Sequence, residues 1–164
     1  MNLKKKPIDK ILISACFLGK RVRYNGIVQT LESKLLQQWQ AEGRLFSICP
    51  EVISGLPVPR PPAEINQLTK KVITIEFIDV TSQFANGANQ ALLLCQQHNI
   101  QFALLKESSP SCGSNTIYDG TFSQKKIAGE GLTTQLLRQH GIKVFCEDSI
   151  EELAELINCS DPTS

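Results

Sequence analysis

The chain has 164 residues, 41% of them hydrophobic, and a formal net charge of +1 at pH 7. A chain this long buries enough apolar surface to fold without disulfides, and we expect one domain over 1–164, with flexible ends over 1–9 and 159–164. The near-neutral charge argues against a large RNA or DNA partner, whereas a small nucleobase needs no basic surface. We expect a monomer or a weak dimer.

The predicted elements begin with a short apolar run over 10–16, which follows the basic residues 4–6. This order imitates an export signal, but only about five residues of the run are uninterrupted, and a secretory signal needs roughly 7 to 15. The run is typical of a strand buried on both faces of a parallel sheet. No window approaches the roughly 18 apolar residues of a membrane span, so we expect no membrane association.

Further strands and helices alternate along the chain. Strands are predicted over 10–16, 44–49, 71–77, 102–106 and 142–146, and helices over 31–39, 81–95, 132–137 and 149–158. We expect Thr81 or Ser82 to cap the second helix, and a capping box from Ser149 to begin the last. The alternation predicts an α/β fold in which a mostly parallel sheet lies between helix layers, a Rossmann-like three-layer sandwich.

Cysteines are the most informative residues of this sequence. They are Cys16, Cys49, Cys95, Cys112, Cys146 and Cys159. Most lie inside or at the ends of regular apolar segments, which indicates reduced thiols in a cytoplasmic protein rather than a disulfide framework. Cys16 and Cys49 end the first two strands, and Cys112 follows the fourth, so parallel strands would bring all three to one sheet edge.

The spacing of these three cysteines leaves the metal open. Separations of 33 (49 − 16) and 63 (112 − 49) residues match no sequential zinc-ribbon or ferredoxin motif. Three thiolates without a nearby histidine favour either zinc or an iron–sulfur cluster, with one coordination position left for water or substrate. Any one of them is more simply a packed core residue, as we expect for Cys95. Cys146 is a reserve ligand, and no role is expected for Cys159.

Polar residues beside the cysteines are candidates for catalysis. Glu51 stands two residues after Cys49 and is a candidate general acid or base, although a solvated loop glutamate is the simpler interpretation. Ser109 and Ser111 lie on either side of a proline just before Cys112, where they could hold a substrate oxygen or form an ordinary turn.

A proline-rich segment over 56–62 follows the Glu51 loop. We expect it to stiffen a pocket wall rather than to serve as a ligand for another domain. Within it, Arg60 is a candidate to bind an anion or to pair with Glu64. Tyr24 and Tyr118 each begin a predicted turn and are candidates to stack on a planar ligand.

Five segments, in this order, resemble the bacterial thiouracil desulfidase (TudS) family, and the resemblance spans roughly 10–147. They are SACFLG (14–19), CPE (49–51), LPVPRPPAE (56–64), SPSCGS (109–114) and YDGTF (118–122). The resemblance implies a [4Fe-4S] cluster that is bound by Cys16, Cys49 and Cys112 and has one open iron. It also implies an acid–base role for Glu51 and a catalytic serine, which we place at Ser109, with Ser111 as the second candidate.

The implied activity is a non-redox, hydrolytic desulfurase that converts 4-thiouracil, or its nucleoside or nucleotide, to uracil and sulfide. A thiocarbonyl sulfur is soft and matches an open iron. Two other hypotheses are kept. A cysteine-ligated zinc hydrolase of nucleobases would be expected to carry a Cys-x-x-Cys motif, which is absent. A non-catalytic iron–sulfur sensor or carrier would bind a cluster and change no thiobase.

Overall fold

A computed structural model describes residues 8–27 and 30–160, with side chains as far as 157. Its centre is a parallel sheet in the order β2-β1-β5-β8. The strands are β1 (Ile11–Ser14), β2 (Leu45–Ile48), β5 (Phe102–Leu104) and β8 (Lys143–Phe145). Leu12 of β1 lies beside Phe46 and Ala103. The chain passes from β1 to β2 on one side and later to β5 on the other, so the strand order reverses at β1.

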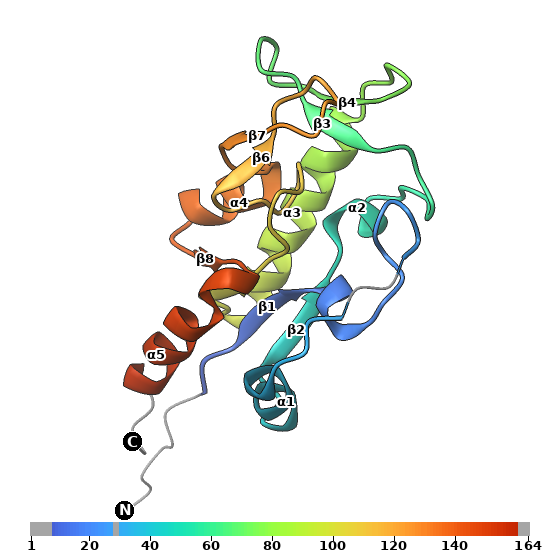
Figure 1. Cartoon of the computed structure of the whole chain (residues 1–164). Coiled ribbons are helices and arrows are strands. Elements are labelled where there is room, and N and C mark those ends of the chain that lie inside the picture. Colours follow the sequence, from blue (N-terminus) through green and yellow to red (C-terminus); the bar gives the residue numbers. More distant parts are fainter. Residues whose placement is uncertain (1–7, 28–29, 161–164) are drawn as a thin grey trace, which may run out of the picture.

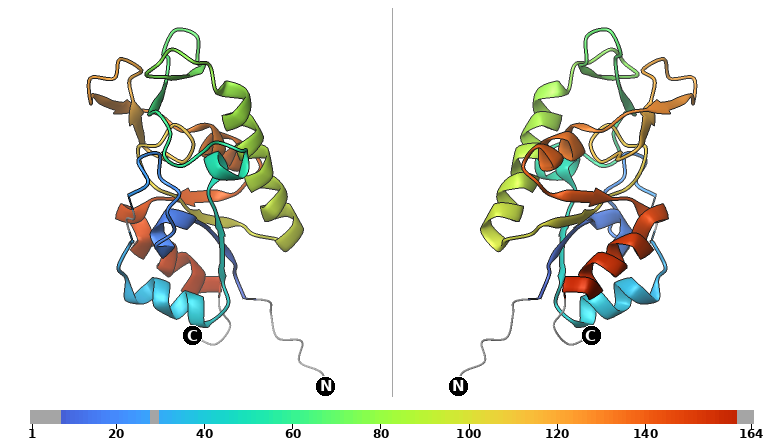
Figure 2. Two further views of the ribbon diagram at one scale, coloured as in Figure 1. Left: turned by 90° about the vertical axis from the view of Figure 1, so that its right-hand side faces the viewer. Right: turned by 90° about the vertical axis from the view of Figure 1, so that its left-hand side faces the viewer.

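Helices cover both faces of this sheet (Figures 1 and 2). They include α1 (Lys34–Ala41), α3 (Thr81–His98), α4 (Leu132–Gln139) and α5 (Ile150–Ser160). Successive side chains of a strand point to opposite faces. Ile11 and Ile13 therefore pack against α1 and α5, while Leu12 packs against α3 and α4. The predicted α/β three-layer sandwich is confirmed.

Two small antiparallel sheets lie beyond the carboxyl ends of the parallel strands (Figure 1). They consist of β3 (Ala63–Ile65) with β4 (Val72–Thr74), and β6 (Thr116–Tyr118) with β7 (Lys126–Ala128). Ile65, Phe84 and Ile117 join them in a separate apolar cluster. The strand predicted over 71–77 is thus β4, outside the main sheet. It pairs with β3 because a short hairpin closes at little entropic cost.

Several predicted helix ends are wrong by a few residues. The first helix begins at Lys34, because the Leu31 N–H donates to Phe17 O (3.1 Å) instead of starting a helical turn. The N-cap of α3 is Val80, while the hydroxyl of Thr81 accepts a hydrogen bond from Val72 N (2.9 Å). Ser149 directly precedes α5, as predicted, but it also ends a 3-10 turn over Glu147–Ser149, and its hydroxyl bonds to the backbone of Cys146.

No helix in the described part of the chain is long and apolar enough to cross a membrane. The flexible ends predicted over 1–9 and 159–164 fall largely on residues 1–7 and 161–164, which lie outside the described residues. The side chain of Cys159 also lies outside them.

Candidate functional site

A cavity of about 670 Å³ lies between the carboxyl edge of the parallel sheet and the two small sheets. Cys16, Cys49 and Cys112 all line it. They come from the loops after β1, β2 and β5, which surround the reversal of strand order, where open α/β sheets bind ligands. The structure therefore brings together the three cysteines that the sequence placed at one edge.

Each of the three cysteines is held by a different local structure. Cys16 lies in a 3-10 turn, Ala15–Leu18, that follows β1 directly. Cys49 is the N-cap of the short helix α2 (Pro50–Ile53), and its thiol donates to Val22 O (3.8 Å). Cys112 lies in the loop between β5 and β6. Cys16 and Cys112 are each only 6% exposed, so both residues are almost fully shielded from solvent.

Burial raises the pKa of all three thiols. The pKa of Cys16 rises to about 11, first through burial and then through the charge that Cys49 would carry. Burial likewise raises the pKa values of Cys49 and Cys112, and Cys112 also interacts with Cys49 and Cys16. The thiols are therefore electrostatic neighbours that are protonated in the cofactor-free chain. Because thiolates are the metal-binding form, a bound metal would displace their protons.

This donor set fits a polynuclear cluster better than a single ion. No histidine lines the cavity among the described residues, which leaves soft sulfur ligands. Within residues 8–27 and 30–157, no group of three or more Cys, His, Asp and Glu is gathered closely enough to hold one metal ion. Three thiols spread around a shared cavity suit a larger iron–sulfur cluster.

The other described cysteines lie apart from this cavity wall. The Sγ of Cys146 accepts hydrogen bonds from Asn115 Nδ2 (3.9 Å) and Ser149 Oγ (3.8 Å), and Cys146 is not among the residues that line the cavity. The structure therefore does not place this reserve ligand with the other three. Cys95 is 1% exposed and packs from α3 against the sheet, as predicted for a core residue.

Glu51, the second residue of α2, lines the cavity and is held by Arg60. Arg60 Nε donates to Glu51 Oε2 (2.9 Å), and Nη2 forms an ion pair with the same oxygen. The guanidinium also donates to Val22 O (2.8 Å) and Pro57 O (3.1 Å). The Arg60 side chain is 5% exposed and that of Glu51 14%. These contacts fix the carboxylate beside Cys49.

The predicted pairing of Arg60 with Glu64 is therefore wrong. Glu64 Oε1 instead accepts hydrogen bonds from the backbone N–H groups of Gly120 (3.0 Å) and Phe122 (3.2 Å). This contact joins β3 to the loop between β6 and β7, and Glu64 and Phe122 both line the cavity. Local sequence could not reveal it, because Glu64 and Gly120 are 56 positions apart.

The two candidate serines line the cavity in different hydrogen-bonding states. Ser109 Oγ accepts from Ser111 N (3.0 Å) and Cys112 N (3.1 Å), which leaves its O–H to donate. Ser111 is 1% exposed, and its Oγ shares a hydrogen bond with Thr133 Oγ1 (2.9 Å) and accepts from the Cys112 thiol (3.6 Å). Ser109 is thus the more available donor, and Ser111 ties the Cys112 loop to α4.

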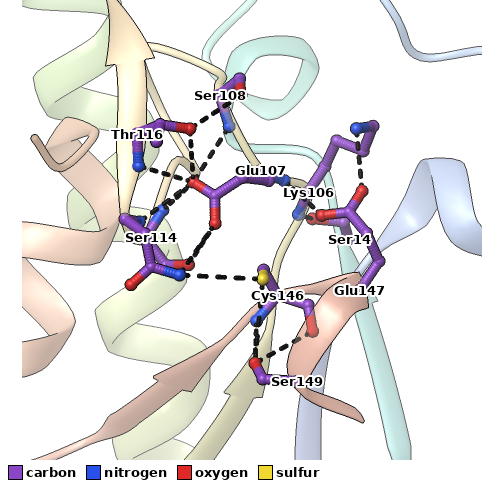
Figure 3. A network of polar contacts seen from close by, with 10 residues as sticks. Ser14, Lys106, Glu107, Ser108, Ser114, Thr116, Cys146, Glu147 and Ser149 are labelled. Atoms are coloured by element: carbon purple, nitrogen blue, oxygen red, sulfur yellow. Dashed lines mark hydrogen bonds and ion pairs between the residues drawn. The ribbon is translucent and has the colours of Figure 1, made fainter. Parts of the chain in front are cut away.

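Two residues of this loop, Ser108 and Glu107, were not predicted from the sequence to have a role at the site. Ser108 lines the cavity with a left-handed backbone (φ +68°), and its Oγ lies 3.0 Å from Thr116 Oγ1. Glu107 accepts several backbone hydrogen bonds, shown in Figure 3. Although burial opposes it, this bonding lowers the pKa of Glu107 to about 2. A glutamate after a strand carries no sequence signal that distinguishes it from a solvated one.

The remaining candidates also lie on the cavity wall. Much of the proline-rich segment lines it, including Pro57 and Pro61, which agrees with a stiffening role. Tyr24 and Tyr118 line it as well, and Lys126 Nζ lies 5.7 Å from the centre of the Tyr118 ring. Both aromatic rings are thus available at a cavity that could take a planar ligand.

Known proteins match this chain over nearly its whole length. A family model described as 2-thiouracil desulfurase matches residues 11–149. The uncharacterized protein YbbK of Bacillus subtilis is 38% identical over 151 residues, which cover 87% of this chain and 99% of YbbK. The solved structure of a [4Fe-4S]-dependent thiouracil desulfidase, TudS, is 52% identical with a TM-score of 0.88, covering 92% of this chain and 99% of that one. The matching family model and the similar solved structure therefore both carry the name of a thiouracil-desulfurising enzyme.

Proposed function

This chain belongs to the 2-thiouracil desulfurase family of enzymes, and we propose on that basis that it removes sulfur from a thiolated pyrimidine with the help of a [4Fe-4S] cluster. One observation carries the proposal: Cys16, Cys49 and Cys112 come from three separate loops and line one cavity together with Glu51 and Ser109. The similar TudS structure, which is that of a [4Fe-4S]-dependent thiouracil desulfidase, supports it.

Cys16, Cys49 and Cys112 would hold the cluster, leaving one iron without a protein ligand. When bound, such a cluster supplies a Lewis-acidic iron whose open position accepts a soft sulfur. Since Cys146 lies off the cavity wall, its bonds to Asn115 and Ser149 assign it a structural role.

The overall reaction exchanges sulfur for oxygen: the thiocarbonyl and one water become a carbonyl and hydrogen sulfide, with no net electron transfer. Glu51 takes a proton from the attacking water, and Arg60 keeps the carboxylate in place. Ser109 donates its O–H to the ring substituent on which negative charge develops. Ser111 is the second candidate, although its hydroxyl is engaged with Thr133.

The substrate we propose is 4-thiouracil or its nucleoside or nucleotide, with uracil and sulfide as products. A cavity of about 670 Å³ lies within the usual range for small-ligand sites. We place the reaction in the cytoplasm, where thiols stay reduced, and expect a monomer or weak dimer without a large nucleic-acid partner.

The decisive experiment is anaerobic reconstitution followed by assays of iron, zinc, acid-labile sulfide and thiobase conversion. We expect iron and sulfide in equal amounts, and loss of the near-ultraviolet absorbance of 4-thiouracil. 2-Thiouracil is assayed in parallel, because the family description names it. A cluster that converts neither free bases nor nucleotides would support the sensor or carrier instead. Zinc without iron would support the zinc hydrolase.

A further inference from the structure

The carboxylate of Glu107 is surrounded by hydrogen-bond donors from the loop that carries Cys112 (Figure 3). Its Oε1 accepts the backbone N–H groups of Ser108 (3.2 Å), Ser114 (2.9 Å), Asn115 (3.0 Å) and Thr116 (3.0 Å). Its Oε2 accepts from Ser114 Oγ (2.8 Å) and Asn115 Nδ2 (3.3 Å). Hydrogen bonds to an ionised acceptor are stronger than neutral ones, so this carboxylate is a strong anchor of the loop. Residues 110–113 are also held by hydrogen bonds to Gly131 and to the first turn of α4.

These donors lie on both sides of Cys112 in the sequence. Residues 108–116 therefore fold back around one carboxylate, with Cys112 near the middle of the segment. The loop is wound tightly, since a Cβ added at Gly113 would lie 2.5 Å from Thr116 O and 2.9 Å from Ser109 O. A loop this tight keeps its shape only if its inward-facing N–H groups find acceptors. Glu107 supplies the acceptor at residue 108 and at residues 114–116, while Ser109 accepts the N–H groups of residues 111–113.

The same network reaches the strand that precedes Cys16. The N–H of Glu107 donates to Glu147 Oε1 (2.8 Å), and Glu147 Oε2 pairs with Lys106 Nζ (2.8 Å). The backbone N–H of Lys106 donates to Ser14 Oγ (2.9 Å), two residues before Cys16. A continuous set of polar contacts thus joins the loop of one cavity cysteine to the strand end of another (Figure 3).

We propose that Glu107 is a positioning residue that holds Cys112 in place relative to Cys16 before any cofactor binds. It touches neither thiol and acts through the backbone of residues 108–116. The inference rests on the proposed function in one respect, which is that Cys112 is a ligand of the cofactor. When the carboxylate is replaced by a neutral amide, four backbone N–H groups lose their charged acceptor, and the loop opens locally while the sheet remains folded.

The first test follows the accessibility of the thiols in the cofactor-free full chain. Wild type and Glu107→Gln are treated with iodoacetamide, and the labelling rate of each cysteine is measured by peptide mass spectrometry. We expect Cys112 to react about tenfold faster or more in the variant, as the loss of a charge-assisted hydrogen bond implies. Cys95, buried against the sheet, should react at an unchanged rate. An unchanged Cys112 rate, or an equal rise at Cys95, would overturn the proposal.

A matched control and a milder variant accompany this test. Glu42→Gln also removes a bonded carboxylate, one that pairs with Arg44 Nε (2.5 Å) just before β2, at the opposite end of the sheet. We expect it to leave Cys112 labelling unchanged. Asn115→Ala removes one donor to Glu107 at an exposed position. It should accelerate Cys112 labelling by less than Glu107→Gln, and it keeps the test valid if that variant does not fold.

A second test uses the reconstituted protein. Iron release to a chelator should be about tenfold faster or more in Glu107→Gln than in wild type, while the two proteins keep the same far-ultraviolet circular dichroism. Equal release rates would contradict the positioning role. A wild type that binds no cluster would refute the proposed function, and the labelling test would still decide the role of Glu107.

Discussion

Cys16 and Cys95 are both buried thiols whose pKa values rise to about 11, yet their surroundings differ. Burial alone raises the pKa of Cys95, which packs between α3 and the sheet. Cys16 also interacts with Cys49 across the cavity, as does Cys112. Residue type and burial therefore do not separate a candidate ligand from a core residue. The presence of neighbouring thiols distinguishes the candidate ligand Cys16 from the core residue Cys95.

A cysteine-to-serine series tests this distinction. Cys16→Ser, Cys49→Ser and Cys112→Ser should each lose most of the bound iron, because the hydroxyl is a poor substitute for a soft thiolate. Cys95→Ser should keep a wild-type iron content, although it leaves a polar group in the core and lowers the free energy of unfolding by about 1–3 kcal/mol. Iron per chain after anaerobic reconstitution is the measurement. A Cys112→Ser protein with full iron would remove that ligand.

Glu51 gives a second prediction at this scale. Glu51→Gln keeps the size of the side chain, so we expect an unchanged iron content and a kcat lower by about 100-fold or more, because the amide cannot take a proton. Glu152→Gln, at an exposed position of α5, is the matched control and should retain wild-type kcat. Near-normal turnover of Glu51→Gln would exclude this carboxylate as the base.

At the scale of elements, the packing of α3 on α2 positions both Cys49 and Glu51. Gly87 is buried on α3, where a Cβ would collide with the carbonyl oxygen of Pro50. The collision partner is backbone, so it cannot rotate away as a side chain could. The two helices can approach this closely because residue 87 has no side chain. Their contact positions α2, which carries Glu51, at the cavity wall.

Gly87→Ala tests this close approach. Alanine favours a helix over glycine by about 1 kcal/mol, while forced overpacking costs about 1–3 kcal/mol or more. Since the carbonyl of Pro50 can move only with α2, we expect the second effect to win, with a lower free energy of unfolding in urea and a lower kcat. Asn89→Ala, exposed on the same helix, should change stability by less than about 0.5 kcal/mol. Equal stability of Gly87→Ala and wild type would show that α3 shifts freely.

At the scale of the whole molecule, the Glu107 network links global stability to pH. Although burial opposes it, hydrogen bonds from the backbone of Thr116, Asn115 and Ser108 and from the Ser114 side chain lower the pKa of this carboxyl to about 2, from a usual value of 4.5. Between these values the unfolded chain binds a proton that the folded chain does not. The contribution to stability is therefore present above about pH 4.5 and is lost as the pH falls toward 2.

The corresponding prediction compares urea unfolding of wild type and Glu107→Gln across this range. The wild type should be the more stable protein near neutral pH, and the difference should shrink as the pH falls from about 5 to about 2. Comparing the two proteins cancels the titration of the other carboxylates. If the difference in the free energy of unfolding stays constant over this pH range, Glu107 has the same pKa in the folded and unfolded states, which would contradict the prediction.

Local periodicity was enough to predict the central sheet, its helix layers and the shared edge of Cys16, Cys49 and Cys112. Buried parallel strands are continuous apolar runs, and the loops after parallel strands meet at one edge, so these features depend on residues close together in sequence. The segments around these cysteines also indicated the family, which the matching family model confirms.

Only the tertiary structure decided which polar groups meet across the cavity. Arg60 bonds to Glu51 rather than to Glu64, and Glu64 bonds to a loop 56 residues away. The strand predicted over 71–77 is β4, which pairs with β3 and does not belong to the main sheet. Such contacts depend on the path of irregular loops, whose turns follow from long-range packing rather than from a repeating pattern of residues. Periodicity therefore predicts where a cysteine stands on an element, but not which carboxylate holds its loop.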